Sequence, residues 1–193
     1  LANDKLQKVK IYMRSMGHPV KVGATGEVNA VKEILSEDGG ITYKNLSMSV
    51  IPEGVREALI VLVPGDKDDE GLRFKSKVID LDKFKKGGFL YVNLVKTKIG
   101  ITLGEQKTVV SPGGMKFINP LHKKEKGVFV VRFFYETPNA DNANWKLMTS
   151  SKMAVYKSRR EICIFYYNES IDNVDFRGIP FITPLPEPKK VQP

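Results

Sequence analysis

One short acidic run is the part of this sequence best suited to binding a cation. Asp66, Asp68 and Glu70 occupy the first, third and fifth positions of a calcium-loop pattern, and Gly71 takes the sixth. Alternating carboxylate oxygens are the ligands that a hard cation prefers. The twelfth position, however, is Lys77 rather than a bidentate acid, and the flanks have the character of strands instead of helices. We therefore expect a solvated turn, with these three acids as a weak candidate metal site.

Groups for nucleophilic chemistry are scarce. The chain has one cysteine and two histidines, whereas a serine nucleophile needs a base that a third group holds in place. His18 precedes a proline in a loop-like stretch, His122 lies among lysines, and Cys163 lies in an apolar run, where we expect a buried, inert thiol. We predict no catalytic residue and no cofactor. A hydrolase that uses carboxylates from distant strands stays open as a third possibility.

The chain is basic, with 31 Lys and Arg against 22 Asp and Glu, a formal net charge of +9 and a pI near 9.5. This charge is spread evenly over both halves, and Tyr91 in its strand is only a weak match to an RNA-binding sheet. We expect charge that aids solubility or attracts the chain to an anionic envelope surface, and we do not favour a nucleic-acid partner. The candidate basic surface consists of Lys123, Lys124, Lys126, Arg159 and Arg160.

Three aromatic residues are candidates for partner binding. In the run 128–135, Phe134 shares a face with Arg132, and Phe133 lies on the other face. The run 162–167, which contains Tyr166, is apolar on both faces, so it is either covered on both sides or used on one side as a contact surface. Trp145 alternates with polar neighbours and is expected on the core face of a strand. An exposed Trp145 would instead indicate a carbohydrate or partner contact.

The elements that must position these residues are short runs rich in Val, Ile, Phe and Tyr, separated by Gly, Pro, Asn and Asp. Their spacing predicts an all-β chain, an antiparallel β-sandwich with one or two short helices at most. The helical candidates are Val28–Leu35 and one turn at Leu81–Lys86. The strands are expected at Val9–Ser15, Tyr43–Ser49, Ala58–Val63, Leu72–Ile79, Phe89–Leu94, Lys98–Leu103, Lys107–Ser111, Val128–Glu136, Asn144–Thr149, Glu161–Tyr167 and Val174–Ile182.

We expect a single sandwich domain over residues 1–183 and an extended, proline-rich tail over 184–193, because no composition change divides the chain. The chain is 41% hydrophobic with 18 aromatic residues, which favours a folded core over disorder. It has no run of eighteen apolar residues that could span a membrane. It begins at Leu1 without a methionine, which fits either a truncated chain or one whose signal peptide has been removed.

A pattern of turns and apolar strands extends over residues from about 50 to 180. It consists of Leu59-Ile60-Val61-Leu62-Val63-Pro64-Gly65, the strand from Phe74 to Asp80, Gly88-Phe89-Leu90-Tyr91-Val92-Asn93-Leu94, the hairpin with Leu103-Gly104 and Pro112-Gly113, and the strand Ser158–Phe165. In these segments the chain resembles an uncharacterised family of predicted exported bacterial proteins. It departs from the family at Lys96-Thr97-Lys98, where the family has a small turn with glycine.

The resemblance implies export and a β-sandwich similar to the immunoglobulin-like modules of the bacterial envelope, with no assigned catalytic residues. We therefore expect a non-enzymatic exported module, periplasmic or associated with the cell envelope, that binds a protein or glycan partner. The alternative is a basic protein that binds a polyanion or nucleic acid through its positive charge.

Overall fold

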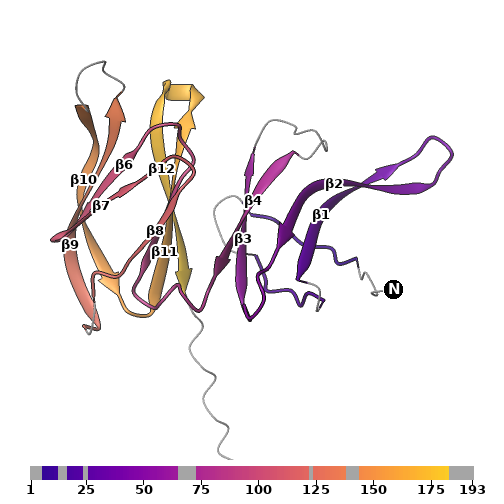
Figure 1. Cartoon of the computed structure of the whole chain (residues 1–193), viewed down its shortest axis with the longest axis horizontal. Coiled ribbons are helices and arrows are strands. Elements are labelled where there is room, and N and C mark those ends of the chain that lie inside the picture. The colour runs from indigo at the N-terminus through magenta and orange to yellow at the C-terminus, as the bar shows by residue number, and fades with distance from the viewer. Residues whose placement is uncertain are drawn as a thin grey trace, which may run out of the picture. The chain divides into compact units, whose positions relative to one another are not determined.

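The computed structural model describes residues 6–12, 17–23, 26–64, 73–121, 124–137 and 144–182. These residues group into two compact units (Figure 1). Unit 1 comprises the described residues up to Lys83, Tyr12 excepted, and unit 2 contains those from Phe84 onward. The sequence predicted one domain over 1–183, because composition does not change at this division. The tail 184–193 lies outside the described residues.

Unit 1 consists of two antiparallel hairpins. The first joins β1 (Glu27–Leu35) to β2 (Ile41–Val50), and the second joins β3 (Ala58–Pro64) to β4 (Phe74–Asp80). The Ser76 hydroxyl donates to the carbonyl of Met48 at 2.8 Å, which ties β4 to β2.

The helix predicted at Val28–Leu35 is wrong, because this segment is strand β1. The spacing of its apolar residues suits a helix, yet a tight turn brings β2 alongside and supplies a ladder of hydrogen bonds. In that turn Gly39 has φ of 81°, a left-handed conformation that glycine adopts without strain, and its N–H donates to the Ser36 carbonyl. The partner strand therefore overrides the local pattern.

Two further local predictions also differ from the structure. Leu81–Lys86 forms turns rather than helix, and within Val9–Ser15 the described residues 9–12 are not in a strand, whereas 13–15 lie outside the described part. The remaining predicted strands correspond to strands of the structure within a few residues, except that the strand predicted at Asn144–Thr149 continues to Tyr156. Two strands were not predicted as such, β1 and β8 (Met115–Ile118).

Unit 2 is a β-sandwich of two four-stranded sheets (Figure 1), so the predicted fold class, an all-β sandwich, is confirmed. The only helix among the described residues is the 3₁₀ turn Glu169–Ile171. Sheet 1 has the order β10-β9-β6-β7, formed by Asn144–Tyr156, Lys126–Thr137, Ile99–Leu103 and Gln106–Val110. Sheet 2 has the order β12-β11-β5-β8, formed by Asn173–Ile182, Arg159–Asn168, Phe89–Asn93 and Met115–Ile118.

Strand pairing is antiparallel with one exception. β5 and β11 run parallel, with Leu90 opposite Ile162 and Val92 opposite Ile164. These two central strands are apolar on both faces, which is typical of strands in parallel pairs. The doubly apolar runs of the sequence therefore mark the middle of sheet 2.

The core of the sandwich lies between the two sheets and is rich in aromatic rings. Phe133 of sheet 1 meets Phe165 of sheet 2 edge to face, with ring centroids 5.0 Å apart, and meets Phe176 at 4.9 Å. Tyr91 is fully buried among them, 5.8 Å from Phe133. Cys163 also points into this core, as the sequence predicted.

Asn93 is a polar residue at the end of β5 that is completely buried. Its side-chain amide donates to the carbonyls of Thr97 at 2.8 Å and Val110 at 2.9 Å, and its carbonyl accepts from the N–H of Val95 at 2.9 Å. All three bonds go to backbone groups. Asn93 thus joins β5 of sheet 2 to β7 of sheet 1, which gives the Val-Asn-Leu motif a structural role.

Candidate functional site: the outer face of sheet 1

The side of sheet 1 that faces away from the core carries the most prominent group of exposed apolar side chains in unit 2. On β9, Val131 and Phe133 point inward and are buried, so Arg132 and Phe134 point outward. This division of faces is the one that the sequence predicted for the run 128–135. We call this side of the sheet the outer face.

A β-bulge places Trp145 on the outer face. The register between β10 and β9 shifts between Leu147 and Thr149, so that the residues before the bulge change faces relative to those after it. After the bulge Val155 is buried and points inward. Without the bulge, Trp145 would point to the same face as Val155, into the core, as the sequence analysis favoured. With the bulge, Trp145 points outward and is 38% exposed. The interpretation of Trp145 as a core residue is therefore wrong.

Trp145 covers a glycine in the neighbouring part of the sheet. Gly100 of β6 lies opposite Phe134, and a Cβ atom added to Gly100 would lie 3.1 Å from Cζ3 of the indole ring. That distance leaves no room for a larger residue without displacing the ring. An aromatic ring over a glycine also shields the bare backbone of the strand. Part of the indole therefore packs on the sheet, while the rest stays accessible to solvent.

Trp145 and Phe134 belong to one patch. Leu147 and Gly100 are the two cross-strand neighbours of Phe134, and Val109 of β7 is the next neighbour of Gly100. Leu147 is 51% exposed and Val109 49% exposed, whereas Phe134 is half-buried beneath them. We call Trp145, Phe134, Leu147 and Val109 the apolar patch. Contiguous exposed apolar residues of this kind mark interaction surfaces more often than isolated ones.

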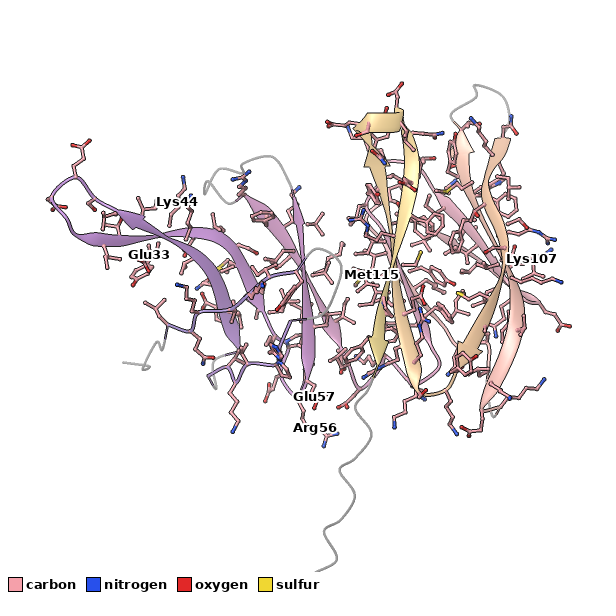
Figure 2. The ribbon with its side chains drawn as sticks, turned by 180° about the vertical axis from the view of Figure 1, so that it is seen from behind. Glu33, Lys44, Arg56, Glu57, Lys107 and Met115 are labelled. Carbon is pink, nitrogen blue, oxygen red and sulfur yellow. The ribbon has the colours of Figure 1, made fainter. Side chains whose placement is uncertain are left out.

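Unpaired cations lie beside the apolar patch. Arg132 of β9 and Lys107 of β7 both lie opposite Thr102, two residues along β6 from the Gly100 position that the apolar patch surrounds. Lys152 of β10 lies opposite Val130, two residues further along β9 than Arg132. All three are exposed, and within the described part of the chain none of them has an ion-pair or hydrogen-bond partner. Figure 2 shows Lys107 on this side of the sandwich and Met115 of sheet 2 on the opposite side.

The outward positions of sheet 1 are strongly biased toward positive charge. Within the four strands, the one acidic side chain at a described outward position is Glu136, and it is already paired with Lys98 at 3.0 Å; the exposed Glu105 lies in the turn between β6 and β7. The basic side chains of the outer face are Lys98, Lys107, Lys126, Arg132 and Lys152. The face therefore combines an apolar patch with a field that attracts anions.

The third predicted partner-binding residue, Tyr166, does not join Trp145 and Phe134. It lies on β11 in sheet 2, alternating with the inward-facing Phe165, so it points away from the core on the opposite side of the sandwich. Its hydroxyl donates to a carboxylate oxygen of Asp175 at 3.1 Å. Tyr166 thus supports the pairing of β11 with β12.

The residues of the predicted basic surface do not form one surface in the structure. Lys124 and Lys126 are exposed, and Lys126 lies on the outer face. Arg159 forms an ion pair with Glu161 at 2.7 Å. Arg160 is only 8% exposed: it donates to the Phe84 carbonyl at 2.9 Å and stacks on the ring of Phe181 at 4.0 Å. Arg160 therefore stabilises the fold and does not belong to a basic surface.

Several other predicted residues lie outside the described part of the chain. They are Lys123, His122, Asp66, Asp68 and Glu70. Within the described residues no group of three or more His, Cys, Asp or Glu side chains is close enough to hold a metal ion. Of the helices that the structure describes, none is long and apolar enough to cross a membrane.

Two buried titratable groups lie in the core of unit 2. Burial raises the pKa of the Cys163 thiol, and the nearby charge of Glu161 raises it further. Burial is also the main cause of the raised pKa of Tyr91, whose hydroxyl has no hydrogen-bond partner in the described part of the structure. The thiol is therefore a weak nucleophile. Since Tyr91 is fully buried, it cannot stack on a base as in an RNA-binding sheet.

The chain matches no protein-family model, and no curated protein shows significant similarity to it.

Sequence reasoning missed Leu147, Val109 and Lys107 as members of the site. The alternation of side chains along residues 128–135 already placed Arg132 and Phe134 on the same face. That alternation could have indicated that basic and apolar residues lie together on the outer face. The neighbours contributed by β7 and β10 depend on strand order and on the bulge, neither of which has a local sequence signal.

Proposed function

We propose that this chain is a non-enzymatic, exported β-sandwich module that binds a protein or glycan partner in the bacterial cell envelope through the outer face of sheet 1. The observation that carries the proposal is the apolar patch, in which Trp145 and Leu147 expose much of their surface beside the half-buried Phe134. A tryptophan at the centre of an interface is among the residues that contribute most to binding energy.

Export and an immunoglobulin-like character are parts of the same proposal. They are supported by the resemblance of residues 50–180 to predicted exported bacterial proteins. The arrangement of unit 2 as two four-stranded sheets is compatible with such a module. The non-enzymatic part is supported by the composition, with one buried cysteine and two histidines.

A second candidate, binding of a polyanion or nucleic acid, is favoured by the unpaired cations of the outer face. Arg132 and Lys107 lie next to the apolar patch rather than on a separate surface. Charge and apolar contact therefore belong to one binding face in both candidates.

Co-sedimentation with purified bacterial envelope fragments tests the proposed function. The full chain is compared with a double variant, Trp145→Ser with Leu147→Ser. We expect the fraction bound to fall about tenfold, because the change removes a tryptophan anchor and its neighbour. Leu147→Asp alone provides a variant that leaves Gly100 covered by Trp145.

The matched control is Leu35→Ser with Ile41→Ser, which removes two apolar residues of unit 1 that are 74% and 55% exposed. This control should sediment like the unchanged chain. Equal binding by the chain and all variants would contradict the proposal, as would an equal loss from the control.

A further inference from the structure

We infer that the outer face of sheet 1 binds an acidic polysaccharide, a chain of sugar rings that bear carboxylate groups. This inference rests on the proposed function and names the chemistry of its partner.

The geometry places two cations one row of residues away from Gly100, the glycine that the Trp145 ring covers. Arg132 and Lys107 flank Thr102 on either side, so their Cα atoms are about 10 Å apart, twice the distance between adjacent strands. Their row lies about 7 Å from the row of Gly100, two residues along the strand. A sugar ring packed on Trp145 thus leaves its neighbours in the chain within reach of both cations.

Charge complementarity favours an anionic partner over a neutral one. Arg132, Lys107 and Lys152 have no carboxylate partner in the described part of the structure, and Glu136 is occupied by Lys98. An arginine guanidinium binds a carboxylate with two parallel hydrogen bonds. The side chains of Thr102 and Ser150 lie in the same row as Arg132 and can bond to sugar hydroxyls.

The distribution of aromatic residues favours a polysaccharide over single-stranded nucleic acid. Nucleic acid is held by a succession of aromatic rings on which consecutive bases stack. On the described outer face Phe134 is half-buried, and the next exposed aromatic residue after Trp145 is Tyr156, at the other end of β10 and about 35 Å away. One aromatic platform beside several cations suits a sugar ring with acidic neighbours.

The test uses the single tryptophan of the chain as its probe. Since Trp145 is the only tryptophan, its emission reports directly on the proposed face. The full chain is titrated with polygalacturonate oligomers, with the same oligomers in fully methyl-esterified, neutral form, and with a single-stranded oligothymidylate. We expect saturable binding of polygalacturonate with a blue shift of the emission, weakening with salt, and much weaker binding of the ester and the oligonucleotide.

A charge-matched pair of variants separates a specific site from general attraction. Arg132→Gln with Lys107→Gln removes two charges from the outer face, and we expect it to weaken polygalacturonate binding about tenfold. Lys32→Gln with Lys44→Gln removes two charges from neighbouring exposed residues on the β1–β2 hairpin of unit 1, where Figure 2 labels Lys44. This control should bind like the unchanged chain.

The other outcomes overturn the inference in distinguishable ways. Equal weakening by both double variants means attraction by net charge alone. Equal binding of acid and ester with a shift of Trp145 emission overturns the acidic partner but leaves the proposed function standing. Tighter binding of the oligonucleotide replaces the polysaccharide by a nucleic acid. No binding of any polymer overturns the inference, and the proposed function is then decided by sedimentation with envelope fragments.

Discussion

Replacing Asn93 by leucine removes the buried polar bridge between the sheets and keeps a side chain of the same branching and the same number of heavy atoms. The native side chain makes three hydrogen bonds of 2.8 to 2.9 Å to backbone groups of Thr97, Val110 and Val95. Leucine can make none of them, so the Val110 carbonyl and the Val95 N–H lose a partner in a buried place, and the Thr97 carbonyl loses one in a half-buried place. Each buried group costs about 1–3 kcal/mol, so for the two buried groups we expect the free energy of unfolding of unit 2 to fall by about 2–6 kcal/mol.

The assay is urea denaturation followed by the emission of Trp145, which lies in the same unit as Asn93. The matched control is Asn144→Leu, an exposed position on β10 where we expect a change within about 0.5 kcal/mol. A loss of less than about 1 kcal/mol for Asn93→Leu would refute the reasoning. Such a result would mean that the three hydrogen bonds of Asn93 stabilise unit 2 no more than the apolar contacts of a leucine at the same position.

Three further predictions concern buried or titrating groups of unit 2. Tyr91→Phe removes a buried hydroxyl without a partner, so the free energy of unfolding should stay the same or rise by up to about 1 kcal/mol; a loss of that size in urea denaturation would show that the hydroxyl is bonded. Cys163 should resist a thiol-specific reagent at neutral pH in the folded chain and react once urea unfolds it; rapid reaction of the folded chain would contradict its burial. Burial acts to raise the pKa of Asp175, but hydrogen bonds from Asn168, the Phe176 N–H and Tyr166 together hold it below its ordinary value of 3.8. Stability from this carboxylate is present above that value and is lost as pH falls through the lower folded pKa, so Asp175→Asn should flatten the acid limb of stability against pH; an unchanged limb would exclude Asp175 as its source.

The sequence predicted the two faces of β9 correctly, because Phe133 and Phe134 lie in a regular strand in which alternation is preserved. The same argument failed for Trp145, since the bulge after Leu147 reverses the faces and has no local signal. Alternation before the bulge and alternation after it are each regular. Only the pairing with β9 shows that they are out of phase.

Long-range pairing also explains the other differences. Val28–Leu35 has apolar spacing suited to a helix, but β2 makes it a strand. The charge of Arg160 suggested a surface position, yet Phe181 of the neighbouring strand and the Phe84 carbonyl bind its guanidinium. Asn93 lay within a motif recognised from the sequence, and its bonds to residues up to 17 positions away became visible only in the fold.

Hydroxyl-radical footprinting of the full chain, free and bound to bacterial envelope fragments, tests most directly whether the outer face of sheet 1 binds the partner. Trp145 and Leu147 are exposed in the free chain, and so are Leu35 and Tyr43 of unit 1. We predict that binding protects Trp145 and Leu147 from oxidation and leaves Leu35 and Tyr43 as reactive as before. Unchanged oxidation of Trp145 and Leu147 in the bound chain would contradict the account.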